Sequence, residues 1–275
     1  MTDAGPLEGR TIGITADRRW QEQADLFTKR GAVVMHGPTM RTMDLSRDEG
    51  LRSVTAELVA RPPAYLIATT GMGMRWWLAA AADWGLAAPL LDGLARARVI
   101  ARGAKSASAV RGAGLEVWWQ APSERMDDIV DRLAAEDATG ERVALQLFEP
   151  AGHPSTDALR ALSGELIELP VYRWLLPEDP GPAQHLITAT IEGRVDAVTF
   201  TSQPAVHQLF RLAADMGGNA ESGLRDALNG PVLAACVGPV CAEAAVTEGV
   251  TESVWPDPPR LVGLVKLVAE RLGRS

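Results

Sequence analysis

Short apolar runs rich in β-branched residues alternate along the chain with stretches in which apolar residues recur every three or four positions. The first run covers residues 11–15, and Trp20, Ala24 and Phe27 then share one helical face before Gly31 ends the helix. Further strands are predicted at residues 32–36, 65–69, 98–101, 116–119, 142–148, 165–171, 196–201, 232–237 and 252–255. Amphipathic helices are predicted between them, with the clearest apolar faces at residues 126–133, 206–213 and 261–268. This alternation predicts parallel sheets with helices on both faces.

The two halves of the chain resemble each other at four places in the same order. Residues 9–15 match 140–146, 68–70 match 200–202, 103–106 match 238–241, and 117–118 match 254–255. The alternative explanation of these matches is that all βα units look somewhat alike. The constant order and slowly drifting spacing favour a duplicated βα unit of about half the chain.

Extended, proline-containing segments follow the second predicted strand of each half, at residues 36–40 and 169–174. Proline cannot continue a helix and suits edge or linking strands. We therefore expect connector strands at about 35–41 and 169–177. Residues 1–38 and 175–275 then form one discontinuous α/β domain, and residues 39–171 form a second. The predicted fold class is α/β, with two similar parallel-sheet domains joined by two extended connector strands.

Composition and charge limit the kinds of binding partner and the cellular compartment that we expect. The chain has 27 Lys and Arg against 35 Asp and Glu, a net charge of −8, so we expect no binding to nucleic acid. The two cysteines, Cys236 and Cys241, do not form a disulfide framework, which indicates a reducing compartment. No secretory signal or membrane-length apolar run is visible, so we expect a cytoplasmic protein without membrane contact. Nothing indicates an obligate dimer, and we expect a monomer.

Small, hydroxyl-bearing and cationic residues follow several predicted strands. Ligands of open parallel sheets bind beyond the carboxyl ends of the strands, where backbone N–H groups at helix starts attract anions. The alternative is that the Ser and Thr residues only cap helices. The candidate anion-binding residues are Thr15, Arg18, Thr69, Thr70, Gly71, Gly103, Lys105, Ser106, Thr201, Ser202, Gly238, Pro239, Val240 and Cys241.

Tyr172 is one of two tyrosines and lies in a predicted connector. A phenol stays protonated at neutral pH, so its hydroxyl suits a hydrogen-bond donor or weak general acid. The alternative is an aromatic residue packed against the hinge, and Tyr65 is predicted to be a core residue. A catalytic role for Cys241 is disfavoured because no histidine lies near it in sequence.

Metal and nucleotide signatures are missing from the sequence. The histidines, His36, His153, His185 and His207, have no metal-ligand spacing. Neither a GxGxxG nor a GxxxxGK[ST] pattern occurs. We therefore expect no cofactor and no metal.

These features together resemble the uroporphyrinogen-III synthase family over roughly residues 8–273. The most specific pieces are residues 196–202 (DAVTFTS), 237–244 (VGPVCAEA) with Gly249, and 170–172 (PVY). Members of this family close linear hydroxymethylbilane into uroporphyrinogen III, losing water and inverting the last pyrrole ring, ring D, without cofactor or metal. The resemblance implies that this tetrapyrrole, with its eight carboxylates, binds between the domains and is held mainly by main-chain amides.

The resemblance also assigns residue roles. Tyr172 matches the family tyrosine proposed to assist departure of the hydroxyl group. The residues that match substrate-cleft positions are Thr70, Gly103, Ser106, Thr201, Ser202 and Gly238. Catalysis is then expected to come mainly from folding the bilane so that its ends meet.

Two features leave a second function open. Cys241 stands where the family usually has threonine, and a thiol is a weaker hydrogen-bond donor than a hydroxyl. Residues 144–147 and 259–265 resemble an actinobacterial branch in which a synthase-like domain precedes a winged-helix DNA-binding domain. The alternative to a synthase is therefore a sensory or regulatory domain that binds a tetrapyrrole or another small anion and signals to a DNA-binding partner or C-terminal domain.

Overall fold

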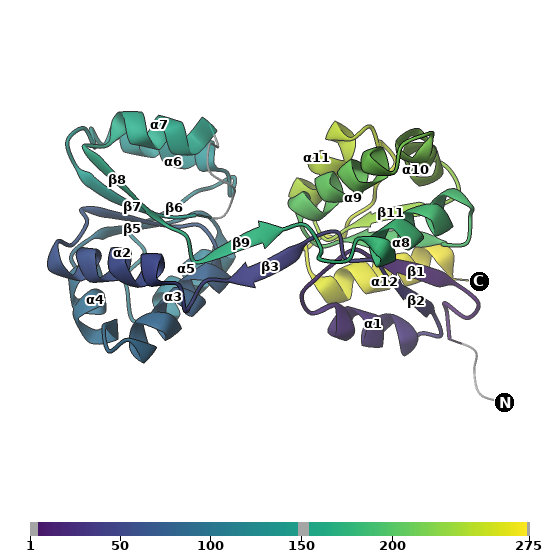
Figure 1. Ribbon diagram of the computed structural model, residues 1–275, viewed down its shortest axis with the longest axis horizontal. Helices are drawn as coiled ribbons and strands as arrows, with labels where there is room; N and C mark the ends of the chain where they lie inside the picture. Colours follow the sequence, from purple (N-terminus) through teal and green to yellow (C-terminus); the bar gives the residue numbers. More distant parts are fainter. Residues whose placement is uncertain (1–4, 148–153, 274–275) are drawn as a thin grey trace. The chain divides into compact units, whose positions relative to one another are not determined.

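The computed structural model describes residues 5–147 and 154–273, and it shows strands and helices alternating along the chain (Figure 1). The strands are β1 (Thr11–Ile14), β2 (Val33–His36), β3 (Arg41–Asp44), β4 (Tyr65–Ala68), β5 (Arg98–Ala101), β6 (Trp119–Gln120), β7 (Arg142–Gln146), β8 (Glu165–Leu169), β9 (Tyr172–Leu175), β10 (Ala197–Phe200) and β11 (Leu233–Cys236). The helices are α1 (Trp20–Thr28), α2 (Glu49–Ala60), α3 (Gly71–Asp83), α4 (Ala87–Leu94), α5 (Ala104–Gly112), α6 (Met126–Ala135), α7 (Pro154–Leu162), α8 (Gly181–Ile191), α9 (Gln203–Met216), α10 (Ala220–Leu228), α11 (Pro239–Thr247) and α12 (Leu261–Leu272).

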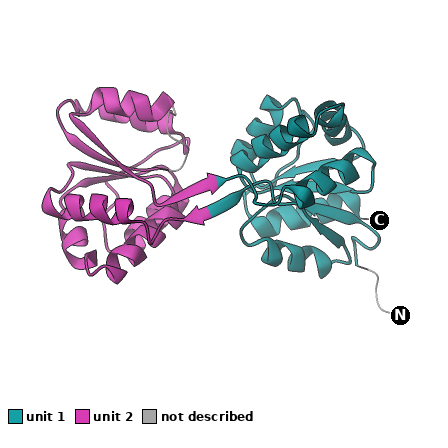
Figure 2. Ribbon diagram, viewed as in Figure 1, with its two compact units in different colours: residues 1–42, 175–275 teal, residues 43–174 magenta. Residues whose placement is uncertain are grey.

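The chain divides into two compact units. Unit 1 comprises residues 1–42 and 175–275, and unit 2 comprises residues 43–174 (Figure 2). Both boundaries fall inside strands β3 and β9, which pair with each other in a two-stranded sheet. The sequence predicts the first boundary at residue 38, whereas the structure keeps the chain with unit 1 to residue 42.

Each unit contains one parallel sheet. The order is β11-β10-β1-β2 in unit 1 and β6-β5-β4-β7-β8 in unit 2. The strand pairs of both sheets are parallel, for example Ile12 with Ala197 and Leu66 with Val99. The predicted α/β class with parallel sheets is therefore confirmed.

The internal repeat corresponds to the topology of the sheets. β1 and β7 hold the same place in their sheets, as do β10 and β4, and β11 and β5. The last match of the repeat is displaced, because Ile100 pairs with Trp119 while Ala235 pairs with Val254. Trp119, rather than Val117, is thus the counterpart of Val254. The predicted strand at 252–255 is reduced to this single bridge, and β6 keeps only two residues.

Alternate residues of the central strands pack against helices on opposite faces. In β4, Leu66 and Ala68 pack with α2, α3, α4 and α5, whereas Tyr65 and Ile67 pack with α6 and α7. In unit 1, Val198 and Phe200 pack with α8 to α11, and Ala197 packs with α1 and α12. Burial on both faces explains why the strands read as apolar runs rather than as alternating polar and apolar residues.

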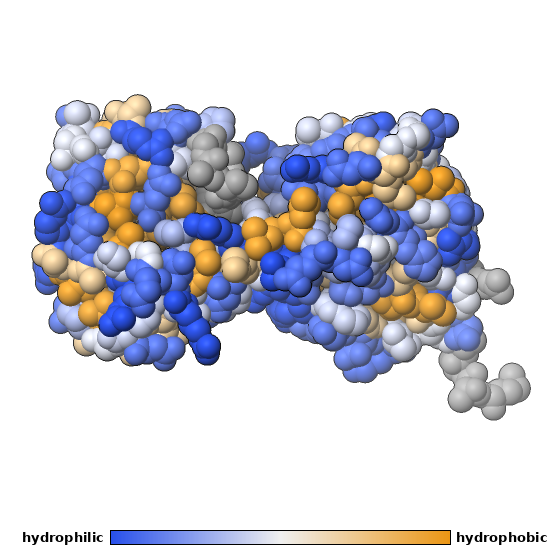
Figure 3. Space-filling view, in the orientation of Figure 1, coloured by the Kyte–Doolittle hydropathy of each residue, from blue (hydrophilic) through white to orange (hydrophobic). Residues whose placement is uncertain are grey.

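The face of each unit that Figure 3 shows is largely polar. Figure 3 shows hydrophilic residues over much of the visible face of each unit, with smaller hydrophobic areas between them. Among residues 5–147 and 154–273, no helix combines the length and apolar character that crossing a membrane requires.

One buried polar contact ties α2 to α3 in unit 2. The indole Nε1 of Trp77 donates to Thr55 Oγ1 at 2.9 Å, and both residues are fully buried. Thr55→Val leaves this N–H without an acceptor, so we expect the free energy of unfolding to fall by about 1–3 kcal/mol in urea titrations.

Thr188→Val is the control. Thr188 donates to the carbonyl of Gln184, four residues earlier, but no side chain of the described residues donates to it. Its replacement is expected to change stability by less than about 0.5 kcal/mol. Equal losses in the two variants would contradict the role assigned to the Trp77 hydrogen bond.

Candidate functional site

The junction between β4 and α3 carries three of the predicted residues, Thr69, Thr70 and Gly71. Thr70 is the N-cap of α3, and its Oγ1 accepts a hydrogen bond from Gly73 N at 3.1 Å. The capping interpretation therefore holds for Thr70. Thr69 is buried, and its hydroxyl donates to the carbonyl oxygen of Gln146 at 2.9 Å.

Gln146, at the end of β7, holds this junction. Its Oε1 accepts from Thr69 N at 3.1 Å and from Thr70 N at 3.0 Å. These two amides are thus already engaged within the protein. Gln146 is not among the site residues predicted from sequence. The repeat makes it equivalent to Thr15, which is among them.

The starts of α3 and α5 lie side by side. A side chain on Gly71 would overlap the carbonyl oxygen of Lys105, so the close approach requires glycine. Lys105 is exposed, and so is Arg75, whose guanidinium reaches back to the first turn of α3 near Gly71. Arg75 lies outside the sequence prediction, and its position one helical turn after Gly71 is the signal that could have found it.

The amides at the start of α5 bond to Ser106 of the helix itself and to Glu124, which precedes α6. Gly103 N donates to Ser106 Oγ at 3.0 Å, and the same hydroxyl donates back to Gly103 O at 2.9 Å. The next amide, Ala104 N, donates to the Glu124 carboxylate at 3.1 Å. Ser106 is therefore a buried cap whose hydroxyl is directed inward.

Tyr172 lies beside Thr70. Its hydroxyl donates to Thr70 Oγ1 over 3.4 Å, a long hydrogen bond. The ring is only 5% exposed and packs edge-on to Trp76, with centroids 6.2 Å apart, and obliquely to Trp174, at 5.9 Å. The structure thus combines both interpretations of this residue, since the ring is packed while its hydroxyl lies at the start of α3.

In unit 1, the predicted residues follow β1, β10 and β11. Thr15 is fully buried, and its hydroxyl donates to Thr199 O at 2.8 Å. Thr201 and Ser202 are half-buried, and the Ser202 hydroxyl makes no capping bond to α9. The capping alternative therefore does not hold for Ser202. Arg18 is exposed.

Cys241 is buried at the start of α11. The hydrogen bond to Cys236, followed by burial, raises the pKa of the Cys241 thiol, while backbone donors from Val237 and Ser202 act against this. The thiol is therefore neutral and directed inward, which argues against both a nucleophile and a side-chain contact to a ligand. The Cys241 side chain therefore belongs to the interior of unit 1.

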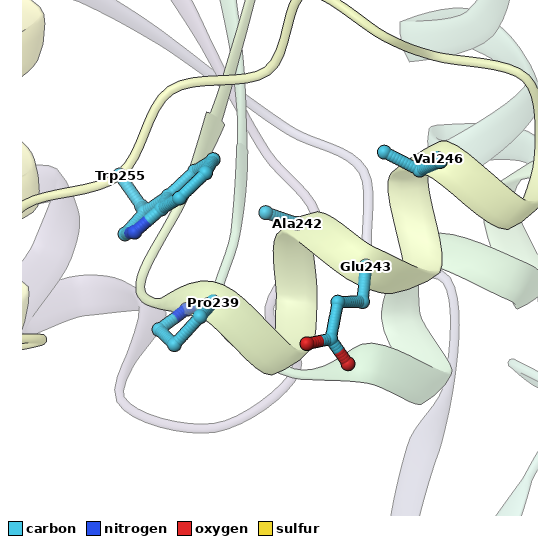
Figure 4. Close-up of a pocket in the computed structure, with 5 residues that line it drawn as sticks. All are labelled: Pro239, Ala242, Glu243, Val246 and Trp255. Atoms are coloured by element: carbon cyan, nitrogen blue, oxygen red, sulfur yellow. The ribbon is translucent and has the colours of Figure 1, made fainter.

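A pocket of about 310 Å³ runs along the outer side of α11 (Figure 4). Residues from successive turns of α11 line it, and the Trp255 indole forms the facing wall. The lining residues are Pro239, Ala242, Glu243, Val246 and Trp255. Pro239 is the only predicted site residue among these five, and Val240 beside it is 43% exposed.

The predicted residues therefore gather at the carboxyl edge of each sheet. In unit 2, Thr70 is half-buried, whereas Thr69, Gly71 and Ser106 are buried. In unit 1, Thr201 and Ser202 are half-buried, whereas Thr15 and Cys241 are buried. Within the described residues no group of three or more His, Cys, Asp or Glu could hold a metal ion, and His153 lies outside them.

The state of the two thiols can be measured. The pKa of the Cys241 thiol is raised, and both cysteines are buried. We therefore expect neither Cys236 nor Cys241 to react with Ellman's reagent at about pH 8 in the folded protein. Both should react once the chain is unfolded in guanidinium chloride. Rapid labelling of the folded protein would show that the thiols are reachable.

The sequence of the chain matches a known family. The family described as Uroporphyrinogen-III synthase HemD matches residues 21–266. "Uncharacterized protein YjjA" of Bacillus subtilis is 25% identical over 267 residues, which cover 96% of each chain. A "Putative uroporphyrinogen-III synthase" of Methanothermobacter thermautotrophicus is 32% identical over 149 residues, covering 54% of this chain and 56% of that protein.

Solved structures agree with this match. A crystal structure of a mutant uroporphyrinogen III synthase from Thermus thermophilus has a TM-score of 0.81 and 28% identity, covering 96% of this chain and 98% of that one. Another crystal form of the synthase from the same bacterium has a TM-score of 0.64 over the same shares. With the family match spanning most of the sequence, the chain belongs to the uroporphyrinogen-III synthase HemD family.

Proposed function

We propose that this protein is a uroporphyrinogen-III synthase that closes hydroxymethylbilane with loss of water and inversion of ring D. Family membership supports a synthase-like function. The observation that carries the proposal is the Tyr172 hydroxyl beside the N-cap of α3, since this joins a proton donor to a set of anion-binding groups.

The first chemical step breaks the C–O bond of the hydroxymethyl group. The oxygen leaves as water once it has received a proton, and a neutral phenol can supply that proton. The hydrogen bond from Tyr172 to Thr70 is long, so a substrate oxygen that approaches the phenol can replace Thr70 as acceptor. Thr70 holds the phenol in place until then.

Carboxylates of the substrate need donors beside this phenol. Because Thr69, Thr70 and Gly73 already use their amides, the remaining N–H groups at the start of α3 are those of Gly71, which is buried, and Met72, which is half-buried. Within the described residues these two amides have no acceptor, as expected for the first turn of a helix. The Arg75 guanidinium lies near Gly71, and Lys105 is exposed at the adjoining start of α5. Both cations add local positive charge to a chain with a net charge of −8.

The contribution of the fold is orientation. A linear bilane cyclises without a catalyst to the type I isomer, so the protein must bring the two ends together in the arrangement that inverts ring D. Fixing several carboxylates at rigid helix starts restricts the conformations of the bilane and lowers the entropic cost of ring closure.

Product analysis tests the proposal. We expect the protein, incubated with freshly generated hydroxymethylbilane, to yield the type III isomer, detected by separating the oxidised porphyrin isomers. Type I product alone would refute the synthase. If a tetrapyrrole then bound without conversion, the sensory alternative would be favoured.

Tyr172→Phe removes the proposed proton donor and keeps the ring between its two tryptophans. We expect type III formation to slow severalfold or more, with circular dichroism unchanged. Tyr65→Phe is the matched control, because the Tyr65 hydroxyl accepts from Arg98 at the opposite end of β4. An unchanged rate in Tyr172→Phe would remove the phenol from the mechanism.

A further inference from the structure

Gln146 combines complete burial with an unusual set of hydrogen bonds. Its Oε1 accepts from two consecutive backbone amides, Thr69 N and Thr70 N, and lies 3.3 Å from the Thr69 hydroxyl. Since backbone N–H groups can only donate, the oxygen must face the β4–α3 junction. The Nε2 group then points toward Gly73, where it has no partner within the described residues.

The Nε2 group, without a partner among the described residues, lowers the stability of the folded state. A buried N–H group without an acceptor is unfavourable, and a leucine or methionine of similar size would avoid it. Either residue would, however, leave the amides of Thr69 and Thr70 without an acceptor in the interior. The oxygen of Gln146 is therefore the part of this side chain that the junction requires.

The duplicated fold provides an internal comparison. Thr15 occupies the position of Gln146 in unit 1, and its shorter side chain bonds to Thr199 O on the neighbouring strand. The backbone of Ser202, the counterpart of Thr70, instead lowers the pKa of the Cys241 thiol. Among the described residues, then, a side chain from the adjacent strand accepts from the junction amides in unit 2 and not in unit 1, and the unit 2 junction contacts Tyr172.

We propose that Gln146 is a positioning residue for the cyclisation: it fixes the backbone of Thr70, and Thr70 in turn places the Tyr172 hydroxyl and the open amides of α3. This inference rests on the proposed function. Gln146 does not touch the substrate, because its side chain is fully buried. It acts through a connected series of contacts, from Gln146 Oε1 to Thr70 N and from Thr70 Oγ1 to the phenol.

Gly73 is part of the same arrangement. A methyl group at this position would overlap the Gln146 amide, so only glycine leaves room for it. Alanine is otherwise the better residue inside a helix. A methyl group here would also crowd Thr70 Oγ1, so Gly73→Ala should displace both the Gln146 side chain and the Thr70 hydroxyl.

The test compares Gln146→Met with Gln146→Glu in the type III assay. Methionine keeps the volume and removes the acceptor, so we expect kcat to fall about tenfold or more with KM changed less than about threefold. Glutamate retains an acceptor oxygen, and because Nε2 bonds to nothing in the described residues its loss removes no hydrogen bond. We expect Gln146→Glu to recover kcat to within about threefold of the wild type.

Two further variants separate positioning from general destabilisation. Thr55→Val loses a buried hydrogen bond elsewhere in unit 2 and should keep the wild-type kcat, whereas Gly73→Ala should reproduce the defect of Gln146→Met. Amide hydrogen exchange provides a readout independent of turnover, since Thr69 and Thr70 should exchange faster in Gln146→Met than in Gln146→Glu.

The outcomes are distinct. If the wild type forms type III product and Gln146→Met keeps its kcat, the positioning role is overturned while the proposed function stands. A defect in Gln146→Met that Gln146→Glu does not relieve also overturns it. If the wild type forms only type I product, the proposed function fails, and the role of Gln146 fails with it.

Discussion

Burial of each parallel sheet between two layers of helices is the constraint on which the rest of this structure depends. Apolar side chains must leave both faces of every central strand, as Leu66 and Ile67 do in β4. In a parallel sheet each helix that follows a strand begins at the same edge. Backbone donors therefore accumulate there without any lysine or arginine being needed. An acidic chain can in this way present local sites suited to acidic ligands.

The fold could be predicted from sequence because burial leaves a simple pattern. Runs such as residues 65–68 and 197–200 are apolar throughout, and the repeat at 9–15 and 140–146 marks equivalent strands in the two sheets. The strands at the ends of the two sheets are harder to predict. The last strand of each sheet has little to bury, so Trp119–Gln120 and Val254 form short contacts where full strands are predicted.

The candidate residues could be placed at strand ends from sequence, but their individual contacts could not be predicted. A hydroxyl at a strand end can contact a side chain of another segment, cap a helix or bond to a neighbouring strand, and Ser202, Thr70 and Thr15 show these three outcomes. Which outcome occurs depends on residues far away in the chain. The partner of Thr69 and Thr70 is Gln146, more than seventy residues later. No local motif encodes such a partnership.

The pairing of β1 with β10 has a consequence for synthesis of the chain. Ile12 lies opposite Ala197, so the sheet of unit 1 cannot be completed until the ribosome has translated all of unit 2. Unit 2 is continuous from residue 43 to 174 and has its own sheet and cores. It can thus collapse first during translation, while the N-terminal segment waits for its partners. Once folded, unit 2 shortens the chain between the two sequence segments of unit 1, so these segments can pair more readily.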